Sequence, residues 1–135
     1  MEPTWDDIRK ILKTAKVIAV VGLSNNPDRP SHDIAGYLKR AGYRIIPVNP
    51  TIKEALGEKS YPSLREVPEK VDVVQIFRRS EEVPAVVEDA IAIGAKVVWM
   101  QPGAENDEAA SRAEQAGLVA VNGACMMVAH RTLRM

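Results

Sequence analysis

Short apolar runs alternate along the chain with longer segments in which apolar residues recur every three or four positions. The runs at 17–21, 44–48, 71–76, 97–101 and 119–121 are rich in Val and Ile. Uniformly apolar runs of this length are typical of strands buried on both faces of a parallel sheet. The periodic segments between them predict amphipathic helices.

The helical period marks a first helix of about ten residues after Thr4, and then segments near 31–41, 83–93, 107–115 and 125–133. Thr4 precedes Asp7 by three residues, which resembles a capping box. Ser31 is expected to cap the second helix. The segment 51–68 is expected to be irregular, with a minor strand near Tyr61 and a helical turn at Leu64.

Alternating strands and helices imply right-handed crossovers between parallel strands. We therefore expect an α/β fold, a three-layer Rossmann-like parallel sheet of five to six strands flanked by helices. At 135 residues the chain is long enough for one core. We expect residues 1–135 to form a single domain.

Composition restricts the function classes. Lys plus Arg and Asp plus Glu both number 18, so a broadly basic nucleic-acid surface is not expected and any anion site must be local. The chain has one cysteine, Cys125, which excludes an internal disulfide. With only two histidines beside it, no metal site is expected. No signal peptide or membrane-length apolar run is found, so we expect a cytoplasmic protein with no membrane partner.

Ligands of open parallel sheets bind beyond the carboxyl ends of the strands. Most of the exceptional residues of this chain follow the first four predicted strands. The candidate binding residues are Gly22, Leu23, Ser24, Arg29, Pro30, Ser31, Val48, Asn49, Pro50, Phe77, Arg78, Arg79, Gln101 and Gly103.

The first of these loops suits a phosphate. Gly22 would let the backbone approach the ligand, and the following helix would direct amides and its positive dipole end at it. Ser24 and Ser31 add hydroxyls, and Arg29 can form paired bonds to phosphate oxygens. Gly22 is equally consistent with a simple turn, and Ser31 with a helix cap.

A dinucleotide fingerprint needs three glycines and an acidic residue after the second strand. Here only Gly22 is present and Asn49–Pro50 ends that strand, which disfavours NAD and favours a ligand with a ribose phosphate, such as coenzyme A. Arg78 and Arg79 would supply cations for it, and Phe77 an apolar wall for adenine. The two arginines are equally consistent with solvent-exposed side chains that form ion pairs with Glu81 and Glu82.

At this point the chain resembles the small stand-alone CoA-binding domain proteins, which are similar to the CoA-binding domain of the succinyl-CoA synthetase alpha subunit. The resemblance runs from about residue 8 to 130. Its motifs are Ala19–Ser24, Asp28–Ser31, Gly42–Tyr43, Pro47–Pro50, Tyr61–Leu64, Phe77–Arg79, Trp99–Gly103 and Cys125–Met126.

The resemblance implies non-covalent binding of coenzyme A. It would put the phosphates on the Gly22–Ser31 loop and the ribose and pantetheine path along Asn49 and Pro50. The adenine and 3′-phosphate would lie at Phe77–Arg79, with Gln101 and Gly103 forming the opposite wall. Ala124 departs from the arginine common at this position in the family, so any role of that arginine is absent. Synthetase activity is not implied, because the phosphorylated histidine of the synthetase belongs to another domain.

Three function classes remain open. The first is a CoA-binding carrier, sensor or regulator with no catalytic residue. The second is an NAD(P)-dependent or acyl-CoA enzyme with Cys125 as nucleophile, paired with His130 at near-helical spacing; the alternative for Cys125 is a small buried apolar residue. The third is an interaction domain whose pocket is vestigial. A homodimer also stays open.

Overall fold

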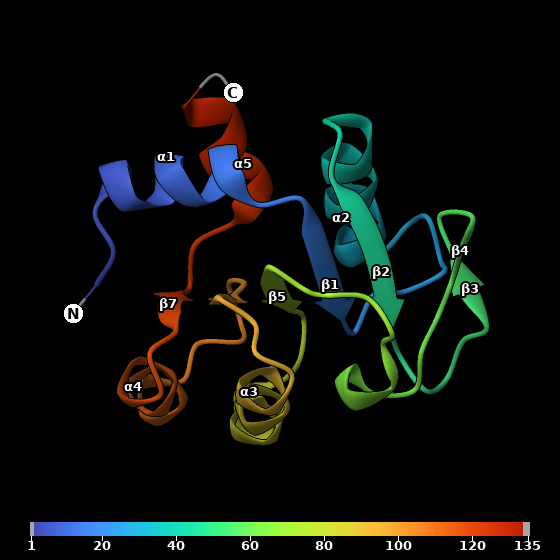
Figure 1. Ribbon diagram of the computed structural model, residues 1–135. Coiled ribbons are helices and arrows are strands. Elements are labelled where there is room, and N and C mark those ends of the chain that lie inside the picture. Colours follow the sequence, from blue (N-terminus) through green and yellow to red (C-terminus); the bar gives the residue numbers. More distant parts are fainter. Residues whose placement is uncertain (1, 134–135) are drawn as a thin grey trace.

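The computed structural model describes residues 2–133, and its centre is a sheet of five parallel strands (Figure 1). The strands lie in the order β2-β1-β5-β6-β7. Their bounds are β1 (Val17–Val21), β2 (Arg44–Val48), β5 (Val73–Ile76), β6 (Val97–Met100) and β7 (Val119–Asn122). The expected α/β Rossmann-like class is confirmed, with the order reversing between β1 and β5.

Helices cover both faces of the sheet and complete three layers (Figure 1). One face carries α1 (Trp5–Thr14), α2 (Pro30–Arg40) and α5 (Met126–Thr132). The other carries α3 (Val83–Ala92) and α4 (Asp107–Gln115). Successive β1 residues alternate between the two cores, Ile18 toward the first and Ala19 toward the second. That double burial is why the strands read as unbroken apolar runs.

The segment after β2 is more ordered than expected. It contains a short antiparallel hairpin, β3 (Glu54–Ala55) and β4 (Glu58–Lys59), and the 3₁₀ turn η1 (Leu64–Glu66). The helical turn at Leu64 is confirmed, and Tyr61 forms one isolated parallel bridge with Val48. Strands of two residues are too short to show a periodicity, so the hairpin could not be predicted from the local pattern.

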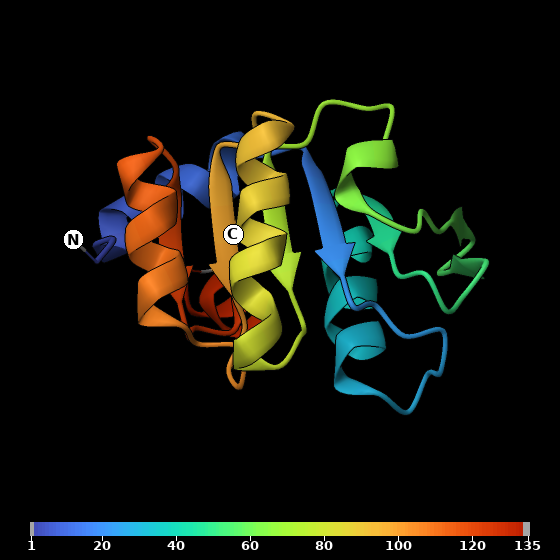
Figure 2. The same ribbon diagram turned by 90° about the horizontal axis from the view of Figure 1, so that it is seen from below.

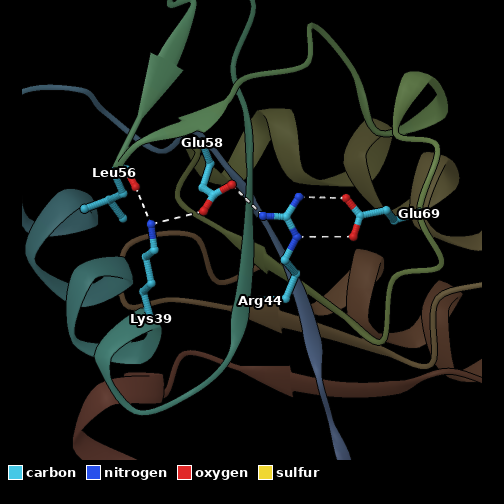
Figure 3. A network of polar contacts seen from close by, with 5 residues as sticks. All are labelled: Lys39, Arg44, Leu56, Glu58 and Glu69. Carbon is cyan, nitrogen blue, oxygen red and sulfur yellow. Dashed lines mark hydrogen bonds and ion pairs between the residues drawn. The ribbon is translucent and has the colours of Figure 1, made fainter.

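Side-chain bonds hold this hairpin against the rest of the fold (Figure 3). Glu58 pairs with Arg44 of β2 at 2.5 Å and with Lys39 of α2 at 3.1 Å. Arg44 also pairs with Glu69 at 2.8 Å. Three elements and the segment before β5 are thereby tied together at the β2 edge of the sheet.

Of the two predicted helix caps, the cap of α1 is confirmed and the prediction for α2 is wrong. Thr4 and Asp7 form the predicted capping box, with both reciprocal bonds present. Ser31 does not cap α2, because Arg29 is the N-cap residue and Pro30 opens the helix. Proline is favoured at a first helical position, where its missing N–H costs nothing. The Ser31 hydroxyl is turned to the preceding loop instead.

Candidate functional site

Three loops at the carboxyl edge of the sheet border an open hollow of about 640 Å³. They follow β1, β5 and β6 and meet at the lower edge of the sheet in Figure 2. The third of them leads into α4, while the second contains the 3₁₀ turn η2 (Ser80–Glu82). The hollow is lined by Gly22, Ser24, Arg29, Pro30, Ser31, Phe77, Arg78, Arg79, Glu82, Pro102, Gly103 and Ala104.

The backbone conformation and the close packing at position 22 both require glycine. Its φ is 89°, a conformation that L side chains rarely adopt. A Cβ atom there would stand 2.1 Å from the carbonyl oxygen of Phe77. The absence of a side chain at Gly22 is therefore required by the close approach of the loops after β1 and β5.

The two serines of the first loop bond to backbone. Ser31 Oγ accepts the Ser24 amide at 3.0 Å, and Ser24 Oγ accepts the Asn26 amide at 3.0 Å. A hydroxyl that accepts a bond still has its own proton to donate. Both side chains line the hollow, so each can offer that proton to an anionic ligand.

The start of α2 offers fewer amides than expected. Pro30 has no N–H, and the amides of His32 and Asp33 both donate to the carbonyl of Arg29. The helix dipole still places positive potential at the hollow. Ser31 is the first residue of α2 that carries an amide proton, so direct backbone donation to a ligand would rest on it.

The three arginines of the hollow differ in their partners. Arg79 lies 3.4 Å from Glu82 and 3.7 Å from Glu81 and is highly exposed, so the solvated-pair interpretation fits Arg79. Within residues 2–133, neither Arg29 nor Arg78 makes an ion pair. These two guanidinium groups are the cations left for an anion.

Arg78 also borders a second hollow of about 170 Å³. Apolar side chains from the ends of β1 and β2 and from the segment before β5 form most of its walls. The lining residues are Val21, Val48, Pro50, Pro62, Ser63, Leu64, Arg78, Val86 and Asp89. Arg78 thus stands between the two hollows, and a ligand crossing from one to the other would pass its guanidinium.

Three of the predicted site residues use their side chains inside the protein. Leu23 is fully buried. The Asn49 amide donates to the Leu23 carbonyl at 3.0 Å, and its oxygen accepts bonds from Thr51. Gln101 Oε1 accepts bonds from Gln75 at 3.1 Å and from the Met126 amide at 2.9 Å. These polar groups fix the loops rather than face the hollow.

Sequence reasoning missed several residues at the site. Glu82, Pro102 and Ala104 line the larger hollow, and Ser63, Leu64 and Asp89 the smaller one. Pro102 lies between Gln101 and Gly103, which were both predicted, so its position in the sequence could have indicated it. Asp89 is on the helix after the arginine loop, and no local pattern marks it.

Cys125 and His130, the two residues considered for catalysis, have different neighbours in the structure. His130 Nδ1 lies 2.8 Å from the Tyr37 hydroxyl, and burial lowers the pKa of this histidine. Cys125 is half-buried among the apolar residues under α1, α2 and α5. Trp99 is fully buried, and its indole N–H donates to the Ala124 carbonyl at 2.7 Å, so this side chain packs inside the core.

Within residues 2–133, no three His, Cys, Asp or Glu side chains gather in a way that could hold a metal ion. None of the helices in that range has both the length and the apolar character needed to span a bilayer.

The structure defines a Rossmann-like α/β protein whose sheet has a hollow lined by three arginines at its carboxyl edge, where ligands of such folds bind. Comparison with known families makes the class specific. The model of the CoA binding domain matches residues 16–131, and this chain belongs to that family. The resemblance inferred from the motifs is confirmed.

The relatives fall into two groups. A Bacillus subtilis protein, the uncharacterized YneT, is 46% identical over 128 residues, covering 95% of both chains. The solved structure of a hypothetical protein from Pyrococcus horikoshii OT3 has a TM-score of 0.95 and 44% identity, covering 98% of this chain and 94% of that one.

The second group consists of larger proteins. The ADP-forming acetate–CoA ligase II of Archaeoglobus fulgidus is 34% identical over 95 residues, which are 69% of this chain and 14% of the ligase. The apo structure of acetyl-coenzyme A synthetase 1 from Ca. Korarchaeum cryptofilum has a TM-score of 0.71 and 31% identity, covering 80% of this chain and 26% of that one. The chain therefore spans a small part of these enzymes.

Proposed function

We propose that this chain binds coenzyme A non-covalently at the carboxyl edge of its sheet and acts as a binding or regulatory module. One observation carries the proposal in a chain of this family: the unpaired guanidinium groups of Arg29 and Arg78 border one hollow together with two serine hydroxyls. Coenzyme A carries a diphosphate and a 3′-phosphate, and arginine suits both because its donors match phosphate oxygens in pairs.

The geometry supports a particular course for the ligand. The diphosphate would lie on the loop that carries Ser24, Arg29 and Ser31, beside the positive end of the α2 dipole. The 3′-phosphate would lie at Arg78, where the two hollows adjoin. Phe77 offers the apolar wall for adenine, and Pro50 lines the neighbouring hollow. Pantetheine would follow Pro50, the path that the resemblance implies, and Gly103 would form the opposite wall.

The binding test is titration calorimetry of the purified chain with coenzyme A, dephospho-coenzyme A and NAD. We expect binding of coenzyme A, weaker binding of dephospho-coenzyme A, and little binding of NAD. Thermal shift gives a second readout, since a ligand at a hundredfold excess over its Kd stabilises the fold by about 2.7 kcal/mol. No binding of coenzyme A by either method would overturn the proposal.

Variants then test the assigned cations. Arg29→Ala and Arg78→Ala should each weaken coenzyme A by about 10–100-fold, as expected for a lost charge-assisted bond. Arg112→Ala is the matched control, because Arg112 pairs with Glu88 outside the hollow. Loss of the difference between coenzyme A and dephospho-coenzyme A in Arg78→Ala would support its 3′-phosphate role. Unchanged affinity in Arg29→Ala would reject the phosphate assignment.

A lone thiol suits a reducing compartment, and we propose the cytoplasm as the place where this binding occurs. The pool of coenzyme A that the module would read is then accessible to it. Fractionation of cells that express the tagged full-length chain tests this location. Recovery of the chain from an oxidising compartment would contradict it.

A further inference from the structure

Glu82 is an acidic residue in the wall of a hollow that otherwise presents cations. The hollow of about 640 Å³ is lined by Arg29, Arg78 and Arg79, and Glu82 is the one carboxylate among its lining residues within 2–133. The Glu82 side chain is 42% exposed and lies 3.4 Å from Arg79. A ligand in the hollow would therefore meet this carboxylate as well as the arginines.

A second carboxylate, that of Glu105, lies beside another lining residue. Glu105 Oε1 accepts a hydrogen bond from the Gly103 amide at 2.7 Å, and Gly103 lines the hollow. A Cβ atom at Gly123 would lie 2.8 Å from Glu105 Cγ, so the Glu105 side chain fits there because position 123 has no side chain. The carboxylate thus occupies an amide that a negatively charged group of a ligand would otherwise bind.

Hydrogen bonds join the two segments that carry these glutamates. The Ser80 hydroxyl donates to the Glu105 carbonyl, and the Asn106 side-chain amide donates to the Ser80 carbonyl at 2.9 Å. Ser80 and Glu82 both belong to the η2 turn. The η2 turn and the loop after β6 are therefore held together. We call the side of the hollow that they form, with Glu82 and Glu105, the acidic wall.

The carboxylates at the acidic wall outnumber the cation that pairs with them. Arg79 lies 3.7 Å from Glu81 as well as 3.4 Å from Glu82. Within residues 2–133, Glu105 makes no ion pair. The two unpaired arginines of the hollow are the groups to which the proposed function assigns phosphates, and bound phosphates would neutralise them. The charge that remains for the rest of the ligand is then negative.

We infer that the acidic wall selects the acyl group of the ligand: free coenzyme A and neutral acyl thioesters bind, whereas thioesters whose acyl group ends in a carboxylate are rejected. The inference rests on the proposed function, because it concerns the same hollow. In the proposed course Gly103 forms one wall of the pantetheine path, so an acyl group at the end of pantetheine meets the acidic wall. Like charges brought together at a binding site select against the wrong ligand.

Titration calorimetry with butyryl-CoA and succinyl-CoA tests the selection at constant ligand size. The two acyl groups have the same carbon chain length and differ in whether the chain ends in a methyl group or a carboxylate. We expect the Kd of succinyl-CoA to be about 3–10-fold higher, as for two like charges several ångströms apart in a partly exposed site. Raising the ionic strength from about 0.05 M to about 0.5 M should reduce this ratio, because salt screens exposed charges.

Variants of the acidic wall test which residues are responsible. Glu82→Gln and Glu105→Gln each remove one charge and keep an oxygen that accepts a hydrogen bond. We expect each to lower the ratio of the two Kd values, and the double variant to bring it close to one. Glu81→Gln is the matched control: it makes the same change in net charge beside Arg79, but Glu81 does not line the hollow. The ratio should stay at the wild-type value in this control.

The selection and the proposed function fail in different ways. If free coenzyme A binds but butyryl-CoA and succinyl-CoA bind equally, the selection is overturned and the binding site stands. Preferential binding of succinyl-CoA would also overturn it, because the acyl group would then face the arginines. A ratio that is unchanged in the double variant, or that falls equally in Glu81→Gln, would do the same. If none of the three ligands binds, both the proposed function and the selection are rejected.

Discussion

Gly22 and Phe77 approach one another so closely that a Cβ atom on Gly22 would lie 2.1 Å from the Phe77 carbonyl oxygen. The Phe77 amide donates to the Val21 carbonyl at 2.8 Å, which holds the two loops together. The glycine is therefore part of how the carboxyl edge is built, whatever ligand lies on it.

Gly22→Ala should lower the free energy of unfolding by more than about 3 kcal/mol, since the methyl group adds an overlap with backbone to a disfavoured φ. Urea denaturation measures the loss. Gly117→Ala is the matched control: its φ of 90° is similar, but within residues 2–133 no neighbouring atom lies within 4 Å of the added Cβ, so about 1 kcal/mol of backbone strain is expected. Equal losses in the two variants would contradict the role given to the Phe77 carbonyl.

The layers of the fold could be predicted because each strand is apolar on both faces. Ile18 and Ala19 face opposite cores, and one uninterrupted run records both. The β3–β4 hairpin could not be predicted, because its strands have two residues each and its ion-pair partners, Arg44 and Lys39, lie outside it in sequence. Ion pairs between distant segments leave no local pattern.

The position of the hollow at the carboxyl edge could be predicted from the order of strands and helices. Which side chains line it and which bond inside the protein could not. Arg78 and Arg79 are adjacent in sequence, yet Arg79 lies beside two glutamates and Arg78 borders both hollows. Asn49 and Gln101 look like ligand contacts at strand ends but bond to backbone. A polar residue after a strand can serve either purpose, and the tertiary contacts decide which.

Arg44 joins Glu58 and Glu69 at the β2 edge of the sheet (Figure 3). Arg44→Met should lower the free energy of unfolding at pH 7 by about 0.5–1 kcal/mol, a small value because the guanidinium is 43% exposed and solvent screens it. Arg65→Met removes one pair, with Asp89, and should cost less. Chemical denaturation compares the two, and a larger loss in Arg65→Met would contradict the network.

The same network should respond to acid. Hydrogen bonds from Arg44 lower the pKa of both Glu58 and Glu69 in the folded chain. A carboxyl whose folded pKa is depressed contributes stability above its unfolded pKa, about 4.3, and loses it as the pH falls through the folded value. The difference in unfolding free energy between wild type and Arg44→Met should therefore shrink below about pH 4.3. A constant difference down to the acid transition would contradict this assignment.

Gln75 is fully buried on β5, and its Oε1 atom has no hydrogen-bond partner among residues 2–133. Removing a buried unsatisfied group together with its amide can be neutral or stabilising, so Gln75→Leu should change the free energy of unfolding by less than about 1 kcal/mol. Gln101→Leu should cost about 1–3 kcal/mol, because it leaves the Met126 amide without its acceptor. Urea denaturation orders the two variants, and a greater loss in Gln75→Leu would contradict the prediction.

His130 makes the stability of the chain depend on pH near neutrality. Burial lowers its pKa in the folded state, and the Tyr37 hydroxyl lies 2.8 Å from Nδ1, a bond that a neutral ring can accept. Below the unfolded value of about 6.5 the unfolded chain binds the proton first, so stability falls with pH by at most about 1.4 kcal/mol per unit. Tm measured from pH 7.5 to 5.5 should therefore fall more steeply in wild type than in His130→Gln, which keeps an acceptor for Tyr37 and does not titrate. His32 is present in both chains and cancels from the comparison, so parallel curves would show that His130 is not the group responsible.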